Sequence, residues 1–153
     1  MKQKTTTSSI QNKKAFHDYF IDEKFEAGIA LMGPEVKSIR NGKAALTDAY
    51  VRLKQGEAYI VNMYIAPYEC THHMDLDSKR SRKLLLHKKE LIRLTVKMKE
   101  KGLTIIPLRL YFNARNKAKV EIALGKGKQK FDKRQDLKKK VQQREVDRAM
   151  RHR

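Results

Sequence analysis

The sequence predicts a mainly β fold: a small antiparallel barrel with peripheral helices, followed by a basic C-terminal tail. Short strand-like segments separated by turns occur without the alternating strand and helix units that build a parallel sheet. The chain has 153 residues, 40% of them hydrophobic, which suits one modest core and one appendage. Nearly all of the apolar pattern lies within residues 13–124, so this range is the expected barrel domain, preceded by a flexible lead over residues 1–12.

The first half of the expected domain contains one long strand and one short helix. Residues 19–31 are rich in aromatic and aliphatic side chains and favour a strand, which we expect to bend at Gly28. Residues 33–40 favour a helix, because Pro34 suits the first turn and the following Asn41-Gly42 pair suits the left-handed conformation that ends helices.

The second half is expected to contain two antiparallel strand pairs and a second helix. The pairs are residues 49–53 with 58–65, around a glycine-containing turn at 54–57, and residues 103–112 with 119–124. Leucine and methionine recur at spacings of three and four in the later part of residues 83–101, which predicts a helix that Gly102 ends. Residues 67–82 show no regular pattern and are expected to form a long loop.

The charge of the chain is strongly positive and indicates a polyanionic partner. Lysine and arginine number 36 against 17 acidic residues, a formal net charge of +19. Such an excess opposes folding through self-repulsion, whereas bound phosphates would neutralise it and release their condensed counterions. Nucleic acid is therefore the expected partner. An anionic membrane surface is the alternative, but it calls for a basic amphipathic helix or a lipidation site, and neither is evident.

The sequence offers no pattern typical of a catalytic, metal or cofactor site. The single cysteine lies in Cys70-Thr-His-His-Met-Asp75, which lacks the second spaced pair of ligands of a structural zinc site. No glycine-rich phosphate loop occurs, and the adjacent acids Asp22 and Glu23 would face opposite sides of a strand. We therefore expect no catalytic residue, no metal and no cofactor in a protein that is not an enzyme. One cysteine, no secretory signal and no apolar run of transmembrane length predict a cytoplasmic protein without a membrane partner.

Basic residues gather in residues 79–89, where six of eleven side chains are lysine or arginine. A charge run of this kind is usually a solvated face. Beside the apolar residues Leu84 to Leu86, in a chain of charge +19, it favours a patch that binds RNA phosphates. From charge, the candidate phosphate contacts of the whole domain are Lys37, Arg40, Arg82, Lys83 and Lys88.

The tail, residues 125–153, carries twelve basic and four acidic residues, a charge of +8. Phe131 gives it one aromatic plane for base stacking among many cations. Apolar residues recur every four or five positions further along, a weak stripe for a helix: Leu137, Val141, Val146 and Met150. Repulsion between the basic side chains would keep this helix disordered in the isolated protein, and a phosphate-lined surface would order it. The alternative interpretation is a disordered extension that only aids solubility.

Three motifs follow one another along the chain. They are Asn12-Lys-Lys-Ala-Phe-His-Asp-Tyr-Phe-Ile-Asp-Glu-Lys-Phe-Glu26 with Gly33-Pro-Glu-Val-Lys-Ser38, then Arg82-Lys-Leu-Leu-Leu-His-Lys-Lys-Glu-Leu91, then Gly125-Lys-Gly-Lys128 with Asp132-Lys-Arg134. Together they resemble the SsrA-binding protein family, also called small protein B, of bacterial trans-translation. The resemblance implies a closed, oligonucleotide-binding-like barrel. It also implies binding to the tRNA-like domain of transfer-messenger RNA, and delivery of that RNA to stalled ribosomes for ribosome rescue and peptide tagging.

The resemblance further implies roles for particular residues. Asn12, Glu26 and Leu85 would lie at or support the RNA face. Glu26 would accept a hydrogen bond from a base amino group or a ribose hydroxyl, or orient a lysine; an ion pair at the barrel rim is the alternative. The tail would become helical in the empty mRNA channel and signal to the decoding centre, with the expected contacts Gly125, Lys126, Lys128, Phe131, Asp132, Lys133, Arg134 and Lys138.

The partners implied are transfer-messenger RNA and the ribosome, with elongation factor Tu and alanyl-tRNA synthetase reached only through the RNA, and the protein is expected to be a monomer. Two departures from the family pattern affect the site. Residues 72–82 are not a clean match to the usual Asn-His-x-Pro approach, and Phe131 replaces a frequent histidine, which keeps stacking but loses a protonatable group. The alternative function is a general ribosome-associated RNA-binding or RNA-chaperone protein. A nuclease or RNA-modifying enzyme would need clustered acids or a cofactor loop, and the sequence offers neither.

Overall fold

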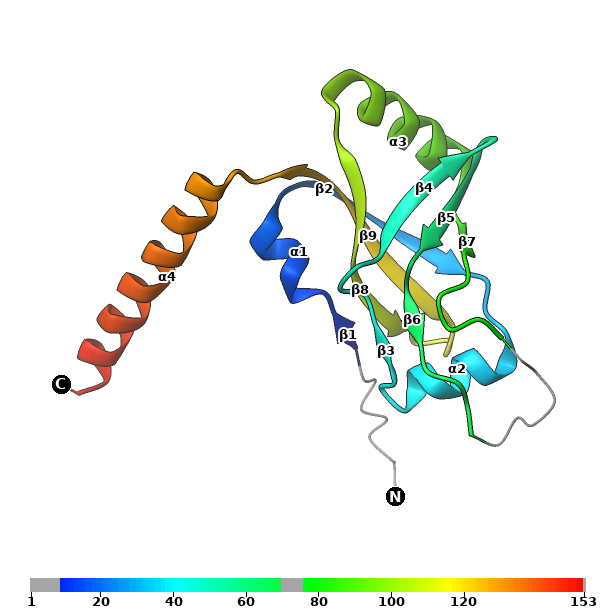
Figure 1. Cartoon of the computed structure of the whole chain (residues 1–153), viewed down its shortest axis with the longest axis horizontal. Helices are drawn as coiled ribbons and strands as arrows, with labels where there is room; N and C mark the ends of the chain where they lie inside the picture. The colour runs from blue at the N-terminus through cyan, green and yellow to red at the C-terminus, as the bar shows by residue number, and fades with distance from the viewer. Residues whose placement is uncertain (1–8, 70–75, 153) are drawn as a thin grey trace.

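The computed structural model describes residues 9–69 and 76–152, which form a seven-stranded sheet, a two-stranded sheet and peripheral helices (Figure 1). The strands are β1 (Ile10–Gln11), β2 (Tyr19–Ile29), β3 (Ala44–Ala45), β4 (Tyr50–Lys54), β5 (Glu57–Val61), β6 (Tyr64–Ile65), β7 (Arg82–Leu85), β8 (Thr104–Phe112) and β9 (Ala118–Gly127). The helices are α1 (Lys13–Asp18), α2 (Gly33–Arg40), α3 (Lys88–Lys101) and α4 (Lys130–Arg151). The prediction of a mainly β fold with helices is confirmed.

Strand pairing in the large sheet follows one continuous path. β1 lies beside β8, which is followed by β4, β5, β7, β2 and β9, and β9 pairs again with β8. All of these pairs are antiparallel. The hydrogen-bonded path from β8 therefore passes through five other strands and returns to β8. β3 and β6 form the small sheet beside it.

The core lies on the inner face of the large sheet, because side chains along a strand alternate between its two faces. Fully buried residues of this face include Ala58, Ile60, Ile105, Val120 and Ile122. Two helices add to the same core through one fully buried residue each, Ile39 of α2 and Leu94 of α3. In Figure 1 these two helices lie at opposite ends of the sheet, so each covers one end of the core.

Three local predictions are confirmed. The helix at residues 33–40 has the expected bounds, with Pro34 in its first turn, and Gly42 beyond its end has φ of 72°. The β4–β5 hairpin turns at Gln55 and Gly56, whose φ angles of 51° and 72° are both positive, as a tight two-residue hairpin requires. β8 and β9 form the expected antiparallel pair.

One prediction within the domain is wrong, and one strand was not expected. The irregularity of β2 lies between Ile21 and Lys24, and Gly28 remains within regular pairing. The helix expected in the later part of residues 83–101 is confirmed as α3, which Gly102 ends with φ of 60°. It begins at Lys88, after a cap in which the His87 backbone N–H donates to the Glu90 carboxylate. Residues 82–85 before it form β7, a strand that was not expected. A short apolar run such as Leu84 to Leu86 is too short for its hydrophobic periodicity to distinguish a strand from a helix. Here the segment forms a strand because it pairs with β5 and β2.

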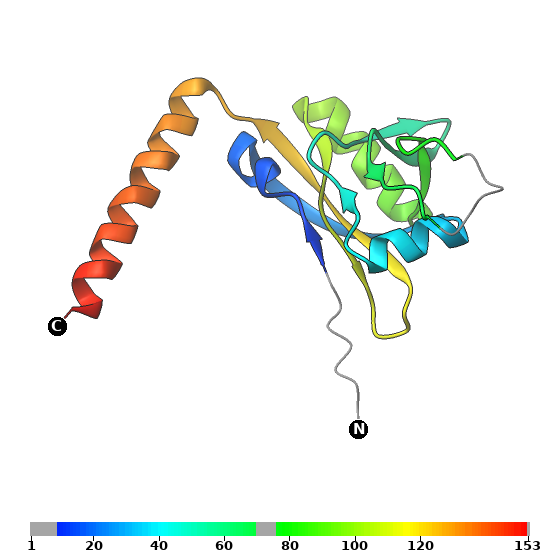
Figure 2. The ribbon, with the colours of Figure 1, turned by 60° about the horizontal axis from the view of Figure 1, so that its bottom comes forward.

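The ends of the domain also differ from the prediction. Ile10–Gln11 pair with β8 inside the range expected as a flexible lead, and α1 follows where no helix was expected. At the other end β9 extends to Gly127, so residues 125–127, expected in the tail, pair with Tyr19 to Ile21 of β2. α4 then projects away from the sheet in both views (Figures 1 and 2).

Candidate nucleic-acid interface

The outer face of β2 and β7 brings together three residues expected to bind RNA: Glu26, Lys83 and Leu85. Gly28 pairs with Leu85 in the register of these strands. A Cβ atom at Gly28 would lie 3.1 Å from the Cβ of Leu85, so the glycine gives the leucine its space. Leu85 is 55% exposed, and Lys83 beside it is exposed as well. This pairing forms a surface with an apolar centre and a cation.

Glu26 accepts a hydrogen bond from the hydroxyl of Tyr111 across the sheet. Burial and this hydrogen bond raise the pKa of Tyr111 to about 12, so the hydroxyl remains a donor at neutral pH. The guanidinium of Arg109 lies 4.4 Å from the centre of the Tyr111 ring. A tyrosine therefore orients the Glu26 carboxylate. The sequence had suggested instead that Glu26 orients a lysine or forms an ion pair at the barrel rim. A carboxylate accepts several hydrogen bonds, so Glu26 retains acceptor capacity for a ligand.

Neither Tyr111 nor Arg109 was expected from the sequence to lie at this surface. Tyr111 lies 85 residues from Glu26 along the chain, and only the register of β8 and β9 against β2 brings the two together. Arg109 also lies 3.4 Å from the carboxylate of Glu121. No local motif marks such a contact, because strand register is a tertiary property.

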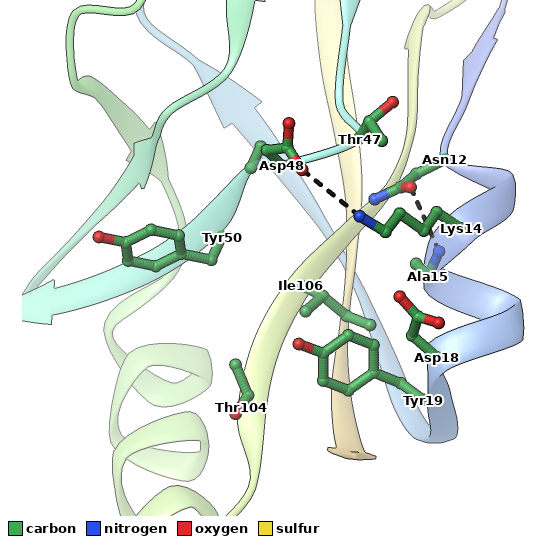
Figure 3. A pocket seen from close by; sticks show the side chains of 11 residues that line it. Asn12, Lys14, Ala15, Asp18, Tyr19, Thr47, Asp48, Tyr50, Thr104 and Ile106 are labelled. Carbon is green, nitrogen blue, oxygen red and sulfur yellow. Dashed lines mark hydrogen bonds and ion pairs between the residues drawn. The ribbon is translucent and has the colours of Figure 1, made fainter. Parts of the chain in front are cut away.

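Asn12 is buried and serves the fold rather than a ligand. Its amide nitrogen donates to the carbonyls of Leu46 at 3.2 Å and Pro107 at 3.0 Å. Its side-chain oxygen accepts from the backbone N–H of Ala15 at 3.2 Å and so caps α1 (Figure 3). The side chain is only 4% exposed with all of its polar groups engaged, so it holds α1 against β8 and the segment before β4.

Arg82 does not contact solvent, and its prediction as a phosphate contact is wrong. The residue is 1% exposed, and its Nε donates to the Glu35 carboxylate at 2.6 Å. Its remaining nitrogens donate to the backbone carbonyls of Met63, Arg80 and Ser78. Burial lowers the pKa of Arg82, and the Glu35 carboxylate opposes that shift. Because β7 alternates, the odd-numbered neighbours Lys83 and Leu85 face outward while Arg82 and Leu84 face the core.

The other three basic candidates are exposed but are divided between two helices. Lys37 and Arg40 are on α2, where their charges lie 5.2 Å from the ring centres of Tyr68 and Phe112, respectively. Lys88 is the first residue of α3. Since α2 and α3 lie at opposite ends of the sheet (Figure 1), the candidates do not form one continuous patch.

The predicted tail residues divide into two groups. Gly125 is buried in β9, and Lys126 is exposed on the same strand. Lys128 and Lys133 hold the start of α4 to α1: the Lys128 backbone N–H donates to the Asp18 carbonyl at 2.8 Å, and the Lys133 ammonium lies 3.1 Å from the Asp18 carboxylate. Asp132 accepts from the Gln129 backbone N–H and caps α4. Besides Lys126, the exposed members of the set are Phe131, Arg134 and Lys138.

The apolar residues of α4 do not form the expected single stripe. At about 100° per residue, Leu137 and Val141 lie on one side of the helix, while Val146 and Met150 lie on nearly the opposite side. Each of the four is at least 48% exposed. Phe131, 68% exposed, projects from the first turn. The helix therefore presents basic side chains and scattered apolar ones in all directions.

A hollow of about 310 Å³ opens between α1 and the beginning of β4 (Figure 3). Tyr19 of β2 and Tyr50 of β4 are among the residues that line it. It holds Lys14, which lies 3.6 Å from Asp48, together with a second carboxylate, Asp18. Hydrogen bonds from His17 and Lys133 lower the pKa of Asp18, which therefore stays ionised at neutral pH. The hollow is lined by two carboxylates and one ammonium, so its net negative charge disfavours binding of a phosphate there.

The SmpB protein family matches residues 9–152 of the chain. The chain belongs to the SmpB family. Among its relatives, the SsrA-binding protein of Sulfurihydrogenibium sp. is 56% identical over 138 residues, which cover 90% of each chain. The SsrA-binding protein of Moorella thermoacetica is 52% identical over 142 residues, 93% of this chain and 92% of that one. The family predicted from the three motifs is thereby confirmed.

A solved SmpB-like chain gives the corresponding structural likeness. It comes from a structure described as "tmRNA-SmpB: a journey to the center of the bacterial ribosome" and is similar to this chain with a TM-score of 0.67 and 52% sequence identity. The likeness covers 80% of this chain and 85% of the solved one.

Two further observations concern metals and membranes. Within residues 9–69 and 76–152, no group of three or more His, Cys, Asp or Glu side chains could hold a metal ion. Cys70, His72 and His73 lie outside the described residues, so the expectation that they bind no metal stays a prediction. None of the described helices is long and apolar enough to cross a membrane.

Proposed function

We propose that this protein binds transfer-messenger RNA and delivers it to stalled ribosomes in trans-translation. The observation that carries the proposal is membership of the SmpB family over residues 9–152, with relatives named SsrA-binding proteins. The likeness to a chain described with tmRNA and the bacterial ribosome supports the same partners. A net charge of +19 is the electrostatic property that such partners require. Both partners are cytoplasmic, and the protein acts there as a monomer without catalysing a reaction.

The sheet, in this proposal, is a closed barrel of the oligonucleotide-binding type. The support is the pairing path that leaves β8 through β4 and returns to it through β9. A closed sheet has no unpaired edge along that path and fixes outward side chains rigidly. Rigid outward side chains suit recognition of a folded RNA, because little conformational entropy is lost on binding.

The RNA face centres on Glu26, Lys83 and Leu85. Lys83 supplies a phosphate contact, Leu85 an apolar surface for a ribose or base, and Glu26 an acceptor for a base amino group or a ribose hydroxyl. Lys37, Arg40 and Lys88 add phosphate contacts at the two ends of the barrel. Asn12 acts as a positioning residue, because its hydrogen bonds join α1 to β8 and to the segment before β4.

The tail contacts the ribosome in this proposal. α4 carries Phe131, Arg134 and Lys138 on exposed positions, suited to stacking on rRNA bases and pairing with phosphates in the mRNA channel and decoding centre. Repulsion among its basic side chains favours fraying of the helix in solution and its ordering against RNA. Elongation factor Tu and alanyl-tRNA synthetase act on the delivered RNA rather than on this chain.

Selective RNA binding tests the proposal. We expect the full chain to bind transfer-messenger RNA more tightly than an unrelated hairpin of equal length at every salt concentration between 50 and 200 mM, the range over which phosphate contacts weaken steeply. Equal binding of the two RNAs would instead favour the second candidate, a general RNA-chaperone or ribosome-associated protein, which the charge alone also supports.

A further inference from the structure

Three outward side chains lie side by side across three strands on a part of the barrel to which the sequence assigned no function beyond Lys83. Arg52 of β4 pairs with Tyr59 of β5, and Tyr59 pairs with Lys83 of β7. β4, β5 and β7 neighbour one another in this order in Figure 1. Inward residues alternate with these three along each strand, so all three point away from the core. An aromatic ring thus stands between two cations.

The Tyr59 ring borders a hollow of about 260 Å³ on the surface. The other lining residues are Arg52, Lys54, Gln55, Val61 and Ser81. The tight turn at Gln55 and Gly56 shapes one end of this hollow. Two cations, an amide and a hydroxyl therefore surround a space beside an aromatic face.

Hydrogen bonding fixes the orientation of the ring. The Tyr59 hydroxyl donates to the Glu57 carboxylate at 2.5 Å, and the Lys83 ammonium donates to the other oxygen of the same carboxylate at 2.9 Å. The hydroxyl is therefore engaged, and the face of the ring is what remains for a ligand. Glu57 offsets one of the three positive charges of Arg52, Lys54 and Lys83, which leaves the local surface positive.

We propose that Arg52, Tyr59 and Lys83 form a platform on which an unpaired nucleotide of the bound RNA stacks, with Lys54 and Arg52 gripping its flanking phosphates. Stacking on an aromatic face combined with cationic grip on the backbone is how proteins hold unpaired nucleotides. An acidic peptide would use the cations but not a ring face whose hydroxyl is already bonded. The platform lies beside Leu85 on β7, so it extends the proposed RNA face around the barrel, and it rests on the proposed function.

Replacement of the ring tests the platform. Tyr59→Leu in the full chain should raise the Kd for transfer-messenger RNA about thirtyfold, the middle of the range for loss of one stacked base. Tyr59→Phe keeps the ring but loses the hydroxyl whose hydrogen bond orients it, so it should raise the Kd by less than Tyr59→Leu does. Arg52→Gln should lower the slope of log Kd against log salt by about one, the loss of one phosphate contact.

The matched control is Tyr64→Leu, since Tyr64 is an exposed tyrosine on β6 in the separate small sheet. It should not change the Kd, and circular dichroism should report the same fold and thermal transition for all four variants. Photocrosslinking of the complex followed by mass spectrometry should attach nucleotides to the peptide that contains Tyr59. Unchanged affinity of Tyr59→Leu, or crosslinks of this peptide to protein only, overturns the platform.

The outcomes also separate this inference from the proposed function. If the unsubstituted chain shows no preference for transfer-messenger RNA over the unrelated hairpin, the proposed function fails and the platform fails with it. If the preference is present and Tyr59→Leu retains the full affinity, only the platform fails.

Discussion

Asn12 and Arg82 have side chains of the kinds that bind RNA, yet both are buried and hydrogen-bonded within the protein. Arg82 illustrates the cost of such burial, because a guanidinium without water needs a carboxylate and carbonyls in suitable geometry. Glu35, only 4% exposed, supplies the carboxylate, and Arg80 shares it at 2.6 Å. The ion pair between Glu35 and Arg82 joins α2 to β7. The ion pair between Glu35 and Arg80 holds the segment before β7 in place.

Replacement of one partner should therefore destabilise the fold. We expect Glu35→Gln to lower the free energy of unfolding by about 3 kcal/mol, because it leaves a buried guanidinium without its counter-charge. Urea unfolding followed by circular dichroism measures the change. Lys83→Gln is the matched control, since its ion pair with Glu57 is exposed and should contribute less than about 1 kcal/mol. A similar loss in both variants would contradict the structural role of Arg82.

Gly125 gives a second prediction at the residue scale. A Cβ atom there would lie 3.2 Å from Ile106 Cδ1 and 3.2 Å from Tyr19 Cβ, and the latter is held by the backbone of β2. Gly125→Ala should lower the free energy of unfolding by about 1 kcal/mol, at the low end for overpacking. Gly127→Ala, two residues along the same strand with open space around it, should have a smaller effect. Equal thermal transitions of the two variants would argue against the close packing of β2 on β9.

At the scale of elements, the junction between the large sheet and α4 depends on a few polar contacts. Asp18, the last residue of α1, contacts His17 at 2.9 Å and Lys133 at 3.1 Å. The Lys128 ammonium donates to the Asp136 carboxylate and lies 5.0 Å from the ring centre of Phe20. These contacts are partly exposed, so they direct the start of α4 without anchoring it strongly.

The Asp18 carboxyl makes this junction sensitive to acid. A hydrogen bond from His17 and then contacts with Lys133 lower its pKa in the folded protein. Because the folded-state pKa lies below the unfolded value of about 4, the carboxylate stabilises the junction above that pH and this contribution is lost as pH falls through the folded-state pKa. In an NMR titration the Asp18 carboxyl should have a midpoint below about 4. His17→Ala and Lys133→Ala should each raise the midpoint, and an unchanged midpoint in both variants would contradict the assigned cause.

For the whole molecule, the two proposed parts should separate on truncation. A chain ending at Gln129 lacks α4 but keeps all of β9, so it should fold and bind transfer-messenger RNA while peptide tagging on stalled ribosomes is lost. A chain ending at Leu124 also lacks residues 125–127, which pair with β2, and it should be less stable. Thermal unfolding, RNA binding and a tagging assay measure the three properties. Loss of RNA binding in the longer truncated chain would contradict the division between barrel and tail.

The sequence by itself determined the features that depend on short-range properties and on totals. The net charge, the strand-rich pattern, the bounds of α2 and the β4–β5 turn all follow from local composition and backbone preference. The three motifs sufficed for the family, because their order along the chain is itself a sequence property. Lys83 and Leu85 were also expected at the surface as RNA contacts, and both side chains are exposed in the structure.

Only the tertiary structure decided which polar residues face outward and which of them meet. Arg82 and Lys83 are adjacent in sequence, yet one is buried and the other exposed, because a shift of one position along a strand reverses the face. Glu35 and Arg82 lie 47 residues apart, and Glu26 and Tyr111 lie 85 apart. Such contacts depend on the register of several strands at once, which no local pattern encodes. The same register brings Arg52, Tyr59 and Lys83 into one row.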